Sequence, residues 1–184
     1  MNITTWTTAL TLPVSPDRDH IRGPVDAPVS LVEYGDYRCP YCAGTRPIVD
    51  EVQNRMGDEL QFVFRHFPIT TVHAYAEIAA EAAEAAGAQG RFWDMHDVLF
   101  ENQDQLTPSY LRAYAGALGL DTERFDRELA GHVYADRVRE DFMSGVRSGA
   151  NGTPTFFING VRHEGSYELP DLLRALQRVA RARV

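Results

Sequence analysis

Cysteine is scarce in this sequence, with two residues, Cys39 and Cys42, among 184. Two cysteines are too few for a fold held together by a disulfide framework. Because two residues separate them, a disulfide between them would close a loop too small to constrain the unfolded chain much. We therefore expect this pair to be reactive rather than structural.

An excess of basic residues is also absent. The chain has 18 lysines and arginines against 26 aspartates and glutamates, a formal net charge of -8 at pH 7. Nucleic acids and anionic membranes are bound by basic faces that release counterions, so we expect neither as a partner. No dimerisation segment is recognisable, and a monomer is the simpler expectation.

Long apolar segments are lacking as well, since no run approaches the roughly 20 residues that span a bilayer. The first ten residues contain no Lys or Arg, and Pro13 interrupts the short apolar stretch, so they make a poor secretory signal. We expect a soluble chain in the cytoplasm, or a periplasmic or secreted one if an export signal was removed.

The residues that are present suit a globular protein, 44% hydrophobic and 24% charged. Residues 1–28, rich in Thr, Pro and Asp, predict an extended lead-in with one edge strand. Residues 29–35 and 60–67 have the pattern of strands, and residues 40–56 carry apolar side chains at helical spacing. This order predicts a βαβ unit with the cysteines at its strand-to-helix junction.

Residues 73–150 contain no convincing strand pattern and predict an inserted helical domain. The expected helices cover 74–88, 90–100, a segment opened by the capping residue Thr107 and by Pro108 and stopped by Gly119, 121–129, and 134–149. The Ala- and Glu-rich stretch near residue 80 is interpreted as a solvated helix face.

The end of the chain returns to strand. Residues 155–158 and 161–163 flank Asn159-Gly160, a strong hairpin signal, and residues 168–183 predict an amphipathic helix. The whole order predicts an α/β thioredoxin fold with a helical domain inserted between the βαβ unit and the C-terminal hairpin and helix. The expected parts are 1–72, 73–150 and 151–184.

The position of the cysteines suits redox chemistry, because a thiolate, not a thiol, attacks a disulfide. At a helix start, unpaired amides and the helix dipole stabilise an anion, which makes Cys39 the candidate nucleophile. Pro40 fits the first helical position. Cys42 lies one turn further in and is the candidate resolving thiol, and Arg38 is a candidate source of positive charge beside Cys39.

The alternative reading of this pair is half of a zinc site. A second cysteine or histidine pair at recognisable spacing is missing, and the six histidines are scattered along the sequence. An iron–sulfur cluster shared between two chains has weaker support. We expect no metal ligands and no cofactor.

Beyond about Val29, the chain resembles the DsbA-like branch of the thioredoxin superfamily. The resemblance is carried by Cys39-Pro40-Tyr41-Cys42, by Glu33 six residues upstream, by Pro47, and by Thr153-Pro154 before a strand. It implies a cis Pro154 lying against the cysteines and a Thr153 backbone that pairs with an extended substrate. Pro40, Tyr41, Thr153 and Pro154 are therefore the candidate substrate-binding residues.

The resemblance also implies that Glu33 is a buried carboxylate that relays a proton to or from Cys42. Burial would raise its pKa toward the range of a general base. Arg65 or His66, on the neighbouring strand, is a candidate for tuning that carboxylate.

The expected activity is thiol–disulfide exchange with protein substrates, recycled by a redox partner such as glutathione. The direction stays open, because Pro40-Tyr41 is similar to glutaredoxins and to some disulfide isomerases. Two alternatives also remain: a glutathione-dependent transferase or isomerase of the same superfamily, and a non-catalytic module that binds unfolded peptides.

Overall fold

A five-stranded sheet with the strand order β1-β3-β2-β4-β5 forms the centre of the protein. It is seen in a computed structural model, in which residues 9–182 are described. The strands are β1 (His20–Arg22), β2 (Val29–Gly35), β3 (Leu60–His66), β4 (Thr155–Ile158) and β5 (Val161–Arg162). β2 and β3 are parallel, and the other neighbouring pairs are antiparallel. The predicted βαβ unit, edge strand and hairpin are confirmed.

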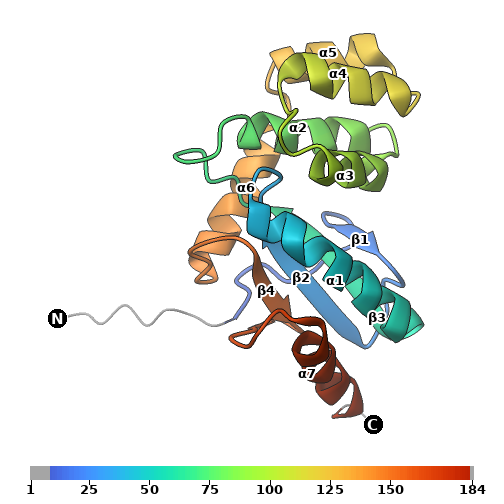
Figure 1. Ribbon diagram of the computed structural model, residues 1–184, viewed down its shortest axis with the longest axis vertical. Helices are drawn as coiled ribbons and strands as arrows, with labels where there is room; N and C mark the ends of the chain where they lie inside the picture. The colour runs from blue at the N-terminus through green and yellow to red at the C-terminus, as the bar shows by residue number, and fades with distance from the viewer. Residues whose placement is uncertain (1–8, 183–184) are drawn as a thin grey trace, which may run out of the picture.

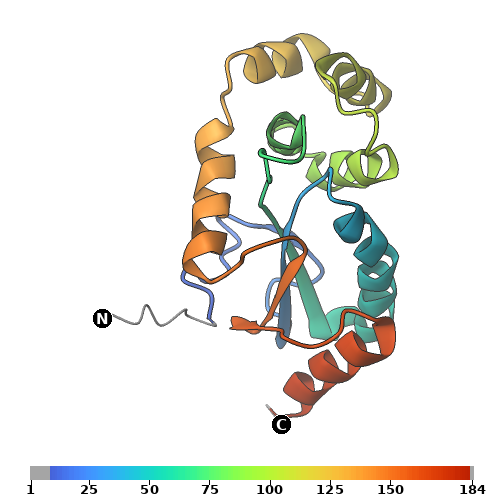
Figure 2. The ribbon, with the colours of Figure 1, turned by 60° about the vertical axis from the view of Figure 1, so that its left-hand side comes forward.

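Helices cover both faces of the sheet and one of its ends. They are α1 (Pro40–Met56), α2 (Ala76–Gly87), α3 (Phe92–Glu101), α4 (Pro108–Ala117), α5 (Thr122–Ala130), α6 (Ala135–Arg147) and α7 (Leu169–Arg181), with a short 3-10 helix, η1 (Gly57–Glu59). α1 and α7 lie on one face and α6 on the other, while α2 to α5 gather beyond one end (Figures 1 and 2). This is the predicted thioredoxin fold with inserted helices.

Two predicted segments extend beyond the described residues. The first eight residues of the expected lead-in and Arg183 of the expected last helix lie outside it. Within residues 9–182, no helix combines the length and the apolar character that crossing a membrane requires.

Side chains of β2 alternate between the two faces of the sheet. Leu31 belongs to a large apolar cluster that includes residues of α1 and α7 and continues into α2 to α5. Val32 and Tyr34 belong to a smaller cluster on the opposite face. Glu33, two residues beyond Leu31, therefore faces the side of the sheet that α1 covers. This alternation decides which side chains can meet the cysteines.

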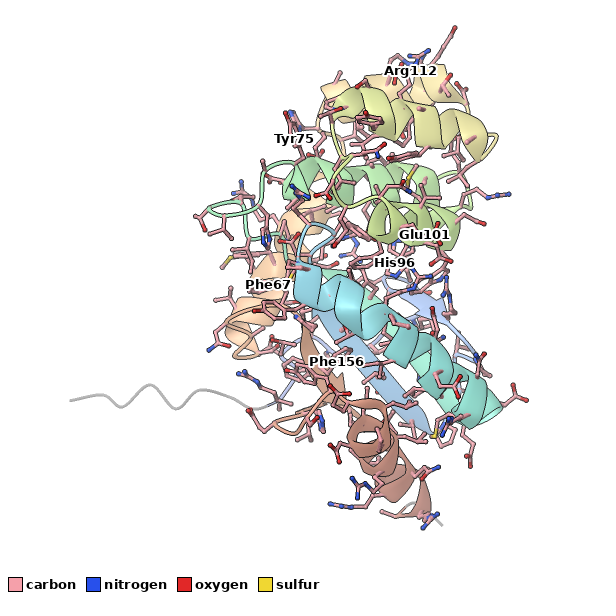
Figure 3. All side chains as sticks on the ribbon, in the orientation of Figure 1. Phe67, Tyr75, His96, Glu101, Arg112 and Phe156 are labelled. Atoms are coloured by element: carbon pink, nitrogen blue, oxygen red, sulfur yellow. The ribbon has the colours of Figure 1, made fainter. Side chains whose placement is uncertain are left out.

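The helix α6 packs directly on the second face. A methyl group at Gly145 would lie 2.7 Å from a ring carbon of Phe67 and 2.9 Å from one of Tyr34. Phe67, labelled beside α6 in Figure 3, also stacks on Phe142 of that helix, with 4.5 Å between the ring centroids. Only glycine permits this close approach.

The helix α2 contradicts the expected solvated face. Nine of its twelve residues are buried, two glutamates among them. Small alanine side chains let α3, α5 and α6 pack close to it. Its buried carboxylates have partners, since Glu84 pairs with His20 and His66, and Glu81 pairs with His132. Composition alone did not reveal that other helices surround this one.

One turn prediction and one helix-start prediction are confirmed. Asn159 and Gly160 have φ angles of 46° and 79°, as a two-residue hairpin turn requires. Pro108 begins α4 as predicted. Thr107 is the N-cap residue as predicted, but its side chain makes no capping hydrogen bond, because its hydroxyl bonds instead to the hydroxyl of Ser109 at 2.9 Å.

Candidate active site

The two cysteines lie at the start of α1, where the predicted strand-to-helix junction places them. Cys39 is the N-cap residue with an extended backbone, and Pro40 is the first helical residue. The Cys39 amide donates to the Asp36 carbonyl at 3.0 Å, and the Ala43 amide donates to the Cys39 carbonyl at 3.2 Å. Both cysteines are free thiols and both are buried.

The pKa of Cys39 is lowered from 9.0 to about 5. The largest cause is a hydrogen bond from the Cys42 thiol, and burial opposes it. The side chain of Thr153 and the backbone amides of Cys42 and Tyr41 lower this pKa further. The predicted contribution of the helix start is therefore present, but the neighbouring thiol contributes more.

Arg38 does not have the role expected for it. Its guanidinium donates to the Gln103 carbonyl at 2.8 Å and pairs with Asp104, in the loop between α3 and α4. It is not among the main groups that shift the pKa of Cys39. An exposed carboxylate on a neighbouring loop holds the charge away from the thiol.

Cys42 has the opposite titration behaviour. Its side chain is 1% exposed. Burial raises its pKa far above 9.0, and the hydrogen bond that it gives to Cys39 and the charge of Glu33 raise it further. One sulfur of the pair is thus favoured as a thiolate and the other as a thiol.

Glu33 lies on the face of β2 that α1 covers, and it is 4% exposed. Burial raises its pKa from 4.5 to about 8, the nearby charge of Arg46 opposes this rise, and the charge of Cys39 adds to it. Its Oε1 atom is buried and has no hydrogen-bond partner. The expected burial and raised pKa are confirmed, and its role in proton transfer stays a prediction.

Neither Arg65 nor His66 tunes Glu33 as expected. Arg65 stands opposite Tyr34 in the strand register, on the other face of the sheet, and its guanidinium pairs with Asp19 at 2.9 Å. The side chain of His66 bonds to Glu84 at 2.8 Å. Successive side chains of a strand point to opposite faces, so Arg65 lies on the face of the sheet away from Glu33. Arg46 on α1 is the cation whose charge lowers the pKa of Glu33.

The loop before β4 lies against the nucleophile. The Thr153–Pro154 peptide bond is cis, and the Cys39 thiol donates to the Thr153 carbonyl at 3.3 Å. The Thr153 hydroxyl is buried and has no hydrogen-bond partner, so it can donate to a Cys39 thiolate. The structure thus brings the Thr153–Pro154 segment to Cys39, as the resemblance implies.

A groove of about 480 Å³ opens beside this loop. It is lined by Pro40, Tyr41, Gly44, Thr45, Ile48, Thr153, Pro154, Ser166, Tyr167 and Glu168. All four candidate substrate-binding residues are among these, and the side chain of Tyr41 is 76% exposed. An extended segment bound here would pass close to Cys39.

Sequence reasoning missed three residues that shape the site. Arg46 opposes the raised pKa of Glu33. The carboxylate of Asp36 accepts from the Ile69 amide and from His73, so it ties the loop before α1 to the loop after β3. Gln103 donates to backbone carbonyls of the active-site turn. Only Arg46 had a usable signal, because it lies one helical turn beyond Cys42.

One group of side chains in the described range approaches the spacing of a metal site. Ligand atoms of His66, Glu84 and Asp141 lie within 4.8 Å of one another. However, Arg137 pairs with Asp141 at 2.6 Å, and Arg18 pairs with the same carboxylate. Guanidinium groups thus supply the positive charge, and the arrangement is a buried ion-pair network.

Comparison with known families gives a match over most of the chain. A family model described as Thioredoxin matches residues 15–178. Similar solved structures include oxidised BdbD from Bacillus subtilis, with a TM-score of 0.82 and 25% identity, covering 95% of this chain and 100% of that one. A thioredoxin-like oxidoreductase from Silicibacter pomeroyi has a TM-score of 0.77 and 27% identity, covering 92% and 94%. These neighbours are DsbA-like thiol–disulfide oxidoreductases.

A third structure, alpha-DsbA1 from Wolbachia pipientis, has a TM-score of 0.77 at 21% identity, with 95% and 97% of the two chains covered. It supports the fold alone.

The curated relatives are longer proteins, and their names describe a different activity. The Na(+)/H(+) antiporter NhaA 1 of Salinispora arenicola is 51% identical over 167 residues, which are 91% of this chain and 26% of that protein. The chain spans about a quarter of the length of the curated relatives it matches.

Proposed function

The chain belongs to the thioredoxin family, and from this premise we propose that it exchanges disulfides with protein substrates through a Cys39 nucleophile and a Cys42 resolving thiol. One observation carries the proposal: the pKa of Cys39 is lowered to about 5 while that of its neighbour Cys42 is raised. A nucleophilic thiol must be ionised near neutral pH, and a resolving thiol attacks only after its proton has been removed.

In the reducing direction, the Cys39 thiolate attacks one sulfur of a substrate disulfide and the other sulfur leaves as a thiolate. A mixed disulfide then joins Cys39 to the substrate. Cys42 loses its proton and attacks the Cys39 sulfur, which releases the second substrate thiolate and forms the Cys39–Cys42 disulfide. Two electrons pass from the enzyme dithiol to the substrate, and the oxidising direction reverses each step.

Glu33 suits the proton transfer that the second attack needs. It shares a buried environment with Cys42, whose pKa its charge raises. With its own pKa at about 8, the carboxyl group can both accept and release a proton near neutral pH. Glu33 therefore accepts the Cys42 proton, directly or through water, when the mixed disulfide is resolved.

The stabilised Cys39 thiolate favours the oxidant direction. Stabilising the reduced form makes the enzyme disulfide easier to give away, so we expect a potential nearer the roughly -120 to -180 mV of strong oxidants than the roughly -270 mV of thioredoxin. The compartment still decides the net flow. A reducing cytoplasm would hold the couple as a dithiol, whereas an oxidising compartment would let it donate its disulfide.

The test is a pair of substitutions assayed by insulin reduction. Cys39→Ser should abolish activity, because the first attack is lost, and Cys42→Ser should leave covalent adducts with partner proteins, because resolution is lost. Full activity of Cys39→Ser would contradict the proposal. An equilibrium titration of the couple against glutathione then measures the direction.

The groove supports a second candidate, a module that binds unfolded peptides, because Tyr41 is 76% exposed at its edge. Undiminished suppression of aggregation by the Cys39→Ser, Cys42→Ser double variant, without redox activity in the wild type, would favour it. The antiporter activity in the names of the curated relatives belongs to proteins of which the match covers about a quarter.

A further inference from the structure

The side chain of Gln103 reaches the active-site turn from the loop between α3 and α4. Its Nε2 atom donates to the Tyr37 carbonyl at 2.7 Å and to the Cys39 carbonyl at 2.9 Å. A carboxamide nitrogen has two hydrogens, and both are used here. Because both partners are carbonyl oxygens, only the NH₂ end of the side chain can face them.

The loop that carries Gln103 is itself held in place. The Asn102 side chain donates to the Val98 carbonyl at 2.8 Å, and the Tyr114 hydroxyl donates to the Gln105 carbonyl at 3.0 Å. Leu106 anchors the loop with a side chain that is 2% exposed. The carboxamide is therefore presented to the turn from a fixed support rather than from a free loop.

A second contact links the same two segments, and in this one the active-site turn supplies the donor. Arg38 donates to the backbone carbonyl of Gln103 at 2.8 Å and pairs with Asp104. Each segment thus gives a side-chain donor to the backbone of the other. The inserted helices and the redox turn are linked at the residues that immediately precede the nucleophile.

We propose that Gln103 is a positioning residue for the redox site: by holding the carbonyl groups of Tyr37 and Cys39, it fixes the turn that aims the first amides of α1 at the Cys39 sulfur. Tyr37 lies two residues before Cys39, and the Cys39 carbonyl begins the peptide that leads into Pro40. With both oxygens directed toward Gln103, the backbone on either side of the sulfur has little freedom to rotate.

This arrangement has a chemical consequence. The amides of Tyr41 and Cys42 are among the groups that stabilise the Cys39 thiolate. Fixed donors stabilise an anion more than donors that must first be oriented. Without Gln103 the turn loosens, the thiolate loses stabilisation, and the reduced form of the couple loses stabilisation with it. The inference deepens the proposed function and rests on it only where activity is concerned.

The test is Gln103→Met, which keeps the length of the side chain and removes its donors. The matched control is Gln105→Met, the same change at an exposed position two residues along the loop. In the reduced protein, thiolate absorbance near 240 nm against pH gives the midpoint of Cys39. We expect Gln103→Met to raise it by about one pH unit and to change the equilibrium constant with glutathione about tenfold, about 30 mV toward a weaker oxidant.

Thermal unfolding of both variants separates positioning from folding, because a merely structural loss would lower the melting temperature without moving the titration. If Gln103→Met does not fold, Gln103→Leu serves instead, because it also removes the donors and adds no charge, and it should shift the midpoint in the same direction. A midpoint and a potential equal to those of the wild type would overturn the proposal.

The two proposals fail differently. A wild type without insulin reduction, together with a shifted midpoint in Gln103→Met, would reject the proposed function and keep the positioning role. An active wild type together with an unshifted Cys39 midpoint in Gln103→Met would keep the proposed function and reject the positioning role.

Discussion

The sulfur of Cys39 lies 3.3 Å from the carbonyl oxygen of Thr153, although 114 positions separate the two residues in the sequence. The contact exists because β4 pairs with β2, with Thr155 opposite Tyr34 and Phe156 opposite Glu33. The inserted helices α2 to α6 lie between these strands in the chain, so the site forms only when the sheet closes. Its chemistry therefore depends on the whole fold.

The first prediction concerns the contribution of Cys42 to the thiolate. Cys42→Ala removes the largest cause of the lowered Cys39 pKa, so the pKa should rise from about 5 and still stay below 9.0, because the amides and Thr153 remain. Cys42→Ser keeps a hydroxyl donor and should shift it less. Titration of both variants near 240 nm measures this, and an unchanged midpoint in Cys42→Ala would contradict the assignment.

The second prediction concerns the buried carboxyl of Glu33. Its pKa is about 8 in the folded protein against 4.5 normally, so between these values the folded state keeps a proton that the unfolded state releases. Stability therefore falls as pH rises through this window, by about 1.4 kcal/mol per pH unit. Glu33→Gln removes that slope and should stabilise the reduced protein by about 3 kcal/mol at pH 7.

Urea unfolding of wild type and Glu33→Gln at several pH values between 4.5 and 8 checks the slope. Parallel stability curves would show that Glu33 is not the group responsible. The same variant should resolve mixed disulfides more slowly, because Cys42 loses its proton acceptor, and this is measured as accumulated adduct in single-turnover reactions.

The third prediction concerns the buried ion pair between Arg65 and Asp19. The side chains of Arg65 and Asp19 are both fully buried. Arg65→Met leaves a buried carboxylate with Arg18 as its remaining guanidinium partner, so unfolding free energy should fall by about 3 kcal/mol. The control is Arg55→Met, whose exposed pair with Glu51 should cost less than about 1 kcal/mol. Equal costs for the two variants would refute the importance of burial.

The fourth prediction concerns the groove. Tyr41→Ser changes an exposed side chain, so stability should stay within about 0.5 kcal/mol. If the groove binds substrate, KM for a protein disulfide should rise several-fold while the Cys39 midpoint stays unchanged. Tyr110→Ser, at an exposed tyrosine on α4, is the control, and an equal effect on KM there would argue against the groove.

Local pattern was sufficient where neighbours in sequence are neighbours in space. The Cys39–Cys42 pair, the helix start at Pro40 and the turn at Asn159 each depend on a few consecutive residues, and all were predictable. The burial of Glu33 came from the resemblance, since both faces of β2 are covered and alternation alone gives no preference.

Contacts between distant elements were not predictable from spacing. His66, Glu84 and Asp141 come from β3, α2 and α6, and only the packing of α6 on the sheet brings them together. Gln103 lies 64 positions from Cys39 on a loop without a motif. The sequence records which residues can carry charge or donate a hydrogen bond, but not which loop will face which turn.

Titration of Cys39 in the reduced wild-type protein, followed as thiolate absorbance near 240 nm with Cys39→Ser as the blank, is the most direct test of a stabilised thiolate at the start of α1. We predict a midpoint at about pH 5, far below the ordinary value of 9.0. A midpoint near 9 would contradict it, because the start of α1 would then hold an ordinary thiol.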